Sequence, residues 1–278
     1  MTLREALLRG RNRPRVLGGG SPTTFRGDGY EFAQLRGYLP GDDIRRIDWA
    51  ATARSGELQT RVVLEDVSLV LAAICDRSPS MDAGRNRCLA QAAMEAVEGW
   101  FEAAQEEDRL ALLTADAPVP TRPGRGTFSR DLALAALRVQ SVSRFELSAA
   151  LDLARAVLPT GAALLLVSDA FEHELCDDVR LLGIGVRYDA TMLLARDPWQ
   201  DGLPLHGFVR FRDLESGEIL SRWIGAAERA RYHEASEARE LAIRRRFESA
   251  GWRVGMLDER DGKASLAGAF GLPQVALR

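Results

Sequence analysis

The sequence contains few of the residues that enzyme and metal sites most often use. Only three histidines occur among its 278 residues, and the three cysteines, Cys75, Cys88 and Cys176, show no C-x-x-C spacing. We therefore expect reduced, buried thiols in a cytoplasmic protein, and neither a disulfide framework nor a zinc site. A nucleophile–histidine–acid set, a Walker loop and a dinucleotide fingerprint are also absent from the sequence. These absences favour a protein that is not an enzyme.

Long hydrophobic runs and a dominant charge are absent as well. No apolar stretch approaches the roughly 20 residues of a membrane helix, and residues 1–4 lead into no signal-peptide core. The formal net charge of -3 gives no general attraction to nucleic acid or to an anionic membrane. We expect no membrane span and no nucleic-acid partner.

The most informative stretch is residues 69–81, with the sequence LVLAAICDRSPSM. Its aliphatic half is short and bounded by polar residues, which predicts a strand buried on both faces of a parallel sheet. Such a strand ends at the carboxyl edge of the sheet, where α/β proteins bind ligands. Asp76, Ser78 and Ser80 follow at alternate positions and carry the hard oxygen donors that Mg²⁺ and Mn²⁺ prefer. The alternative is a strand–turn–helix joint in which Ser80 or Asp82 caps the next helix.

A second aliphatic run ends in the same way. Residues 162–169, AALLLVSD, predict another buried strand that ends in a carboxylate. If the two strands lie side by side, Asp76 and Asp169 meet at one edge of the sheet, where two like charges favour a cation or an arginine between them. We favour this shared site. The alternative is that Ser168 and Asp169 only cap the following helix.

The rest of the chain alternates between helix and strand patterns, which indicates an α/β protein. We predict helices near residues 88–104, 127–139, 145–154, 179–182, 226–249 and 265–270, and strands near 109–115, 186–194 and 251–257. Residues 58–65 predict a strand that flanks the sheet, and residues 206–223 predict a hairpin with a Ser-Gly turn. The arginine-rich residues 1–20 predict a solvated arm that stays mobile until it docks.

Residues 38–49, YLPGDDIRRIDW, have an unusual composition. Arginines, carboxylates and aromatic side chains are mixed there, which predicts a folded lobe held by arginine–carboxylate pairs. This stretch, with the Ala53-Arg54 that follows, closely resembles the signature of the bacterial DUF58 family. In that family the signature precedes a von Willebrand factor A-like core. Residues 76–80, DRSPS, resemble the Asp-x-Ser-x-Ser of the metal ion dependent adhesion site in such a core.

The resemblance implies an α/β fold with a von Willebrand factor A-like, Rossmann-like, mostly parallel sheet that is flanked by helices. This domain would comprise residues 67–278 and carry a small antiparallel insertion near residues 205–224. An N-terminal arm and the signature lobe would form residues 1–66.

The resemblance also assigns a metal site. It gives Asp76, Ser78, Ser80 and Asp169 the role of ligands, with Mg or Mn as the bound ion. A threonine of the second metal loop would contact the ion as well. Phe145 stands at that position and cannot ligate a metal, so Ser141 or Ser143 would have to substitute for it.

Members of the family are commonly encoded beside AAA+ ATPases of the MoxR type. The resemblance therefore implies a non-enzymatic adaptor that binds such an ATPase and acts in protein remodelling or metal-cofactor insertion. A carboxylate of the partner would complete the shell of the cation. Two alternatives stay open. One is a Mg²⁺-dependent hydrolase that uses Asp76 and Asp169, and the other is a structural variant that has lost metal binding, as Phe145 suggests.

Overall fold

A computed structural model describes residues 1–11, 31–39, 44–64, 68–113, 122–138, 145–170, 176–200, 202–214 and 217–273 of the chain. The chain divides into two compact units. The larger unit comprises Met1–Arg15 and Leu69–Arg278, and the smaller one Val16–Ser68. The sequence placed residues 1–66 in one segment, whereas the structure groups residues 1–15 with the larger unit.

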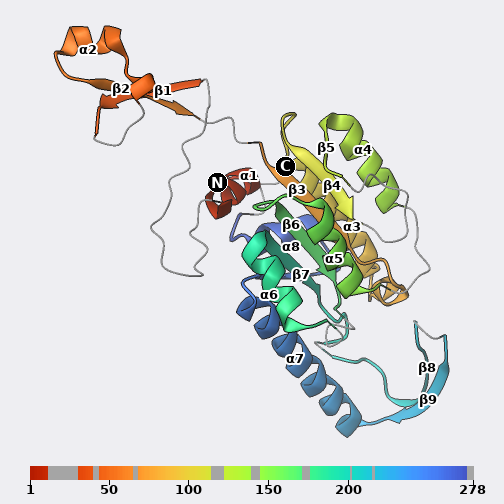
Figure 1. The fold of residues 1–278 in the computed structure, drawn as a ribbon. Coiled ribbons are helices and arrows are strands. Elements are labelled where there is room, and N and C mark those ends of the chain that lie inside the picture. Colours follow the sequence, from red (N-terminus) through yellow and green to blue (C-terminus); the bar gives the residue numbers. More distant parts are fainter. Residues whose placement is uncertain are drawn as a thin grey trace. The chain divides into compact units, whose positions relative to one another are not determined.

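Six strands form the central sheet of the larger unit (Figure 1). They are β3 (Val70–Cys75), β4 (Arg109–Leu113), β5 (Gly124–Arg125), β6 (Ala163–Ser168), β7 (Asp189–Ala195) and β10 (Arg253–Leu257). Their order is β10-β7-β6-β3-β4-β5, and every pairing is parallel except that of β5 with β4. The predicted α/β fold with a mostly parallel sheet is confirmed.

Helices cover both faces of this sheet because its central strands are apolar on both sides. They are α3 (Leu89–Glu102), α4 (Gly126–Leu137), α5 (Leu147–Val157), α6 (Asp178–Arg187), α7 (Ala226–Ser249) and α8 (Gly262–Ala269). Alternate strand residues such as Ile74 and Leu166 pack with α5, α6 and the end of α7 in one buried cluster. Helices α3 and α8 pack against each other and against the strands. None of the helices in the described part of the chain is long and apolar enough to cross a membrane.

The N-terminal helix α1 (Leu3–Arg11) corrects one prediction. Leu3 and Leu7 are one helical turn apart and both are buried. The guanidinium of Arg4 pairs with the fully buried carboxylate of Asp108, whose Oδ1 also accepts a hydrogen bond from Leu69 N at 2.6 Å. The predicted solvated arm is therefore wrong for residues 3–8, whereas the side chains of residues 9–11 and all of residues 12–20 lie outside what the structure describes.

The smaller unit contains β1 (Glu31–Gly37), the 3₁₀ turn η1 (Ile44–Arg46), α2 (Trp49–Ser55) and β2 (Gln59–Leu64). Asp48 caps α2 because its Oδ1 accepts a hydrogen bond from Ala51 N at 2.9 Å. Strand β2, predicted for residues 58–65, pairs antiparallel with β1 in a two-stranded sheet of its own and is not a strand of the main sheet. Residues 40–43 of the signature lie outside the described part of the chain, and its arginine–carboxylate pairing stays a prediction.

A two-stranded hairpin follows β7 in the chain. Strands β8 (Gly207–Arg212) and β9 (Ile219–Ile224) pair antiparallel, and α7 begins directly after β9 (Figure 1). This hairpin agrees with the antiparallel insertion predicted near residues 205–224. The Ser216 of its predicted turn lies outside the described residues, whereas Gly217 has the left-handed φ of 71° that glycine adopts without strain.

Candidate functional site

The candidate site lies where the strand order of the sheet reverses. Strand β4, which follows β3 in the chain, pairs with one edge of β3, whereas β6 pairs with its other edge. The two connections leave this point in opposite directions, and their separation makes room for a ligand outside the carboxyl ends of the strands. Asp76 follows β3 directly and Ser168 is the last residue of β6, so both stand at this point.

Asp76, Ser78 and Ser80 form a polar cluster at the end of β3. The Asp76 Oδ1 atom accepts hydrogen bonds from the Ser78 backbone N at 2.9 Å and from the Ser78 hydroxyl at 2.5 Å. The hydroxyls of Ser78 and Ser80 lie 3.0 Å apart. The 3₁₀ turn η2 (Pro79–Asp82) follows directly after Ser78 and contains Ser80. The structure thus brings together three of the four predicted ligands.

The capping alternative for this loop does not hold. Helix α3 begins only at Leu89, and its N-cap is Cys88, which makes no side-chain capping bond. Ser80 and Asp82 belong to η2 instead. The oxygens of the Asp-x-Ser-x-Ser stretch are therefore not used to begin the following helix.

Ser168 is a site residue that the sequence interpretation missed. Its hydroxyl donates a hydrogen bond to Asp76 Oδ2 at 2.6 Å and accepts one from Ala170 N at 2.9 Å. Ser168 does not cap the next described helix, because α6 is capped by Asp177. The parallel register pairs Cys75 with Val167, which places Ser168 beside Asp76. Both aliphatic runs end in polar residues, and this similarity in the sequence could have indicated that Ser168 lies beside Asp76.

The backbone next to Ser168 is strained. Ala170 has a φ of 49°, and no other non-glycine residue in the described ranges has a positive φ. A left-handed alanine costs roughly 1–2 kcal/mol, and such strain tends to gather at functional sites. The bond from Ala170 N to the Ser168 hydroxyl helps to hold this turn, and so couples the strained turn to the Asp76 carboxylate.

The electrostatic environment of Asp76 disfavours its ionised form. Asp76 is 2% exposed, and its pKa is raised from the ordinary 3.8 to about 6. Burial is the main cause and the nearby Asp169 carboxylate adds to it, whereas the hydrogen bonds from Ser168 and Ser78 partly oppose the increase. Burial and a second carboxylate thus disfavour the charge on Asp76. A bound cation would stabilise that charge.

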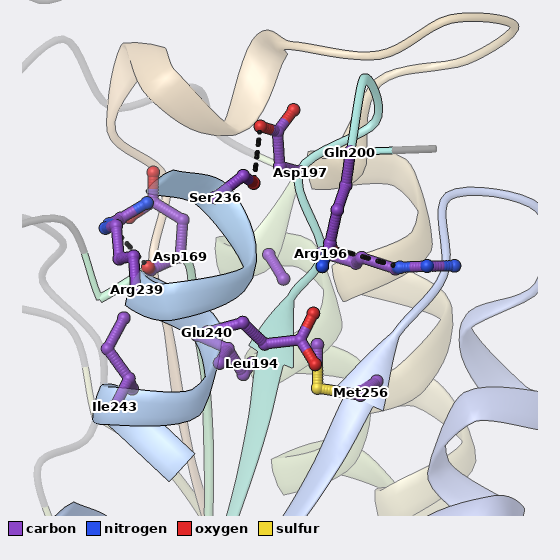
Figure 2. Close-up of a pocket in the computed structure, with 11 residues that line it drawn as sticks. Asp169, Leu194, Arg196, Asp197, Gln200, Ser236, Arg239, Glu240, Ile243 and Met256 are labelled. Atoms are coloured by element: carbon purple, nitrogen blue, oxygen red, sulfur yellow. Dashed lines mark hydrogen bonds between the residues drawn. The ribbon is translucent and has the colours of Figure 1, made fainter. Parts of the chain in front are cut away.

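The fourth predicted ligand, Asp169, lines a small pocket of about 20 Å³ between β7 and α7 (Figure 2). Its backbone carbonyl accepts a hydrogen bond from Arg239 on α7 at 3.1 Å. On the far side of the pocket Asp197 accepts one from Ser236 at 3.0 Å. Asp169 therefore interacts with two parts of the site. Its carboxylate affects the pKa of Asp76, and its backbone carbonyl is bound by Arg239 of helix α7.

Several other positions supply no ligand. Phe145 packs against the apolar core between the sheet and its helices, so it takes no part in the polar cluster. Ser141 and Ser143, the predicted substitutes, lie outside the described residues. Within the described ranges, no group of three or more histidine, cysteine, aspartate or glutamate side chains is placed to hold a metal. A cation at Asp76 would therefore depend on hydroxyl oxygens and water.

The cysteines are free thiols, as predicted, although Cys88 is only half-buried. Cys75 and Cys176 are buried. The pKa of Cys75 is raised to about 12, mainly by burial and in part by the Asp76 carboxylate. Cys75 therefore remains a neutral core group beside the site.

Glu259, which follows β10, holds the loop that leads from η2 to α3. Its carboxylate accepts hydrogen bonds from Arg85 N at 2.7 Å and from Asn86 N at 3.2 Å, although 173 or more residues separate them in the chain. The Arg85 guanidinium lies 5.3 Å from the ring centre of Trp199, in the turn after β7. The loop beside the Asp76 cluster is thus tied to two neighbouring strand ends.

Comparisons with known proteins agree with the signature. Residues 34–242 match the family described as "Protein of unknown function DUF58". "Uncharacterized protein Rv1480" of Mycobacterium tuberculosis and "Uncharacterized protein Mb1516" of Mycobacterium bovis are each 30% identical to the chain over 246 residues, which cover 85% of this chain and 77% of each relative. No solved structure matches the chain. The family match includes residues 38–49 and both strand ends, and the chain therefore belongs to the DUF58 family.

Proposed function

We propose that this protein is a non-enzymatic interaction module that binds Mg²⁺ or Mn²⁺ at the Asp76 cluster and uses the ion to hold an acidic side chain of a partner. Asp76, Ser78, Ser80 and Asp169 are the ligands in this proposal. The observation that carries it is the convergence of the Asp76, Ser78 and Ser80 oxygens at the switch point of the sheet. The resemblance of residues 76–80 to the metal site of von Willebrand factor A domains supports it.

The chemistry of the residues fits a hard divalent cation. Every candidate ligand offers oxygen, which Mg²⁺ and Mn²⁺ prefer over sulfur or nitrogen. The raised pKa of Asp76, caused mainly by burial, supports the proposal, because a bound cation would favour the ionised carboxylate. One or two carboxylates and two hydroxyls leave open positions for water or for an incoming carboxylate, and such an ion would couple partner affinity to the presence of metal.

The partner in this proposal is a MoxR-type AAA+ ATPase, and the activity served is protein remodelling or cofactor insertion. This part rests on the DUF58 membership together with the common gene neighbourhood of that family. The ATPase would present an aspartate or glutamate to the open face of the site.

Titration calorimetry of the full chain with Mg²⁺ and with Mn²⁺ tests the site. We expect saturable binding to the wild type and its loss in Asp76→Ala. Asp82→Ala is the matched control, because it removes an exposed carboxylate from the same loop without touching the cluster. Equal loss of binding in Asp82→Ala, or no binding to the wild type, would refute the proposed site.

The partner is tested with the MoxR-type ATPase encoded by the same organism. Its binding to the wild type should require Mg²⁺ or Mn²⁺, be reversed by EDTA, and fail with Asp76→Ala. Binding that ignores both EDTA and the substitution would favour the structural alternative. Metal-dependent turnover of a phosphoester, lost in Asp76→Ala, would favour the hydrolase instead.

A further inference from the structure

The β8–β9 hairpin exposes large apolar side chains far from the Asp76 cluster in the sequence. Phe208 is 85% exposed and Trp223 is 58% exposed, and their rings meet edge to face with centroids 5.1 Å apart. Ile219 and Leu220 are also exposed. Exposed apolar clusters of this kind mark contact surfaces, because water is displaced from them favourably when a partner binds.

The pairing register shows which residues share a face. Phe208 pairs with Trp223, Arg210 with Ser221, and Arg212 with Ile219. Residues directly opposite each other in an antiparallel pair lie on the same face, and so do alternate residues of one strand. One face of the hairpin therefore carries an aromatic pair followed by two guanidinium groups. Arg222 pairs with Val209 and belongs to the other face.

Phe208, Arg210 and Arg212, which share one face of the hairpin, also lie along the open edge of β8. Within the described ranges β8 and β9 pair only with each other, so β8 has a free edge. Asp213 N donates to Glu218 O at 2.9 Å, which makes that pair hydrogen-bonded. Because bonded and non-bonded positions alternate, the backbone groups of Phe208, Arg210 and Arg212 point away from β9. An added strand could bond to these groups and face these side chains.

The charges on this face select an acidic occupant. Arg210 and Arg212 are exposed, and neither has an ion-pair or hydrogen-bond partner within the part of the chain that the structure describes. Opposite charges across neighbouring strands stabilise their pairing. Nucleic acid fits less well, because its backbone carries phosphate acceptors but no amide donors to match the alternating N–H and C=O groups of an open strand edge.

We propose that the open edge of β8 binds an extended acidic segment of another protein by strand addition. The segment carries an apolar residue opposite Phe208 and acidic residues opposite Arg210 and Arg212, so that its pattern is apolar-x-acidic-x-acidic or the reverse. This surface needs no metal and is separate from the Asp76 site. It therefore goes beyond the proposed function and is tested independently of it.

The test is fluorescence anisotropy with two labelled peptides, Thr-Phe-Thr-Glu-Thr-Glu-Thr and its reverse, in low salt and EDTA. We expect at least one of them to bind the full chain saturably below about 1 mM, the range of weak peptide recognition. The double variant Arg210→Glu/Arg212→Glu should weaken this binding at least tenfold. The same variant should gain affinity for the matching peptide with lysine in place of glutamate, since the charges are then complementary again.

The control is Arg222→Glu, a single arginine-to-glutamate substitution on the other face of the hairpin, which should leave the affinity within about twofold. Circular dichroism verifies that each variant is folded. An equal loss in Arg222→Glu, failure of the charge exchange, or no binding below about 1 mM would overturn the proposal. So would tighter binding of a labelled oligo-dT, or a dimer of the chain in sedimentation that Phe208→Ser disrupts, because a nucleic acid or a second copy would then be the occupant.

Discussion

The hydroxyl of Ser168 donates a hydrogen bond of 2.6 Å to Oδ2 of Asp76, and this bond joins the ends of β6 and β3. Both residues are buried, at 1% and 2% exposure. Replacing Ser168 with alanine leaves one oxygen of a buried carboxyl without this donor. We expect Ser168→Ala to lower the free energy of unfolding by roughly 1–3 kcal/mol and to raise the pKa of Asp76 further. Urea denaturation at pH 7 measures the first effect.

The control for this substitution is Ser249→Ala. Ser249 lies exposed at the end of α7, where its hydroxyl donates to Arg246 O. An exposed site of this kind should change the free energy of unfolding by no more than about 0.5 kcal/mol. If Ser168→Ala and Ser249→Ala lower the free energy of unfolding by the same amount, the bond to Asp76 contributes no more to stability than an ordinary surface contact.

Asp76 should make the stability of the metal-free protein depend on pH. Its pKa is about 6 in the folded state and 3.8 when unperturbed, so the folded protein binds the proton more tightly between these values. The resulting stabilisation is complete below about pH 4 and is lost as the pH rises through about 6. The change corresponds to roughly 3 kcal/mol.

Urea denaturation in EDTA across pH 4 to 7 measures this effect. Asp76→Asn cannot ionise, so its free energy of unfolding should rise relative to wild type as the pH increases. Asp82→Asn, with its exposed side chain, should follow the wild type at every pH. Parallel curves for Asp76→Asn and wild type would show that the Asp76 carboxyl is not held in the environment described.

Helix α8 approaches α3 too closely for a side chain at Gly262. A Cβ atom there would lie 1.8 Å from Ala92 O and 2.8 Å from Ala96 N. Since both are backbone atoms, Gly262→Ala must push the helices apart. We expect it to lower the free energy of unfolding by roughly 1–3 kcal/mol or more, which thermal or urea denaturation measures.

Gly268 provides the comparison within the same helix. A Cβ atom at Gly268 meets nothing within 4 Å. Gly268→Ala should therefore stabilise the protein by up to about 1 kcal/mol, because alanine loses less conformational entropy in a helix than glycine. A similar effect of both substitutions would contradict the close packing of α3 and α8.

Local patterns predicted most of the larger unit because its strands are buried on both faces. Short aliphatic runs such as those that became β3 and β6 have few other stable environments. The N-terminal helix was misjudged for a different reason. Its arginines suggested solvent exposure, but Arg4 pairs with the buried Asp108, which lies about a hundred positions away in the chain, and no local pattern reports such a partner.

The sequence by itself determined that Asp76, Ser78 and Ser80 follow a core strand, because the period of a strand and the end of an apolar run are local properties. The tertiary structure alone decided which groups surround them. The register of β6 against β3 brings Ser168 to Asp76, and the packing of α7 places Asp169 beside Arg239. Register and helix packing depend on contacts between distant segments, and the site is built from those contacts.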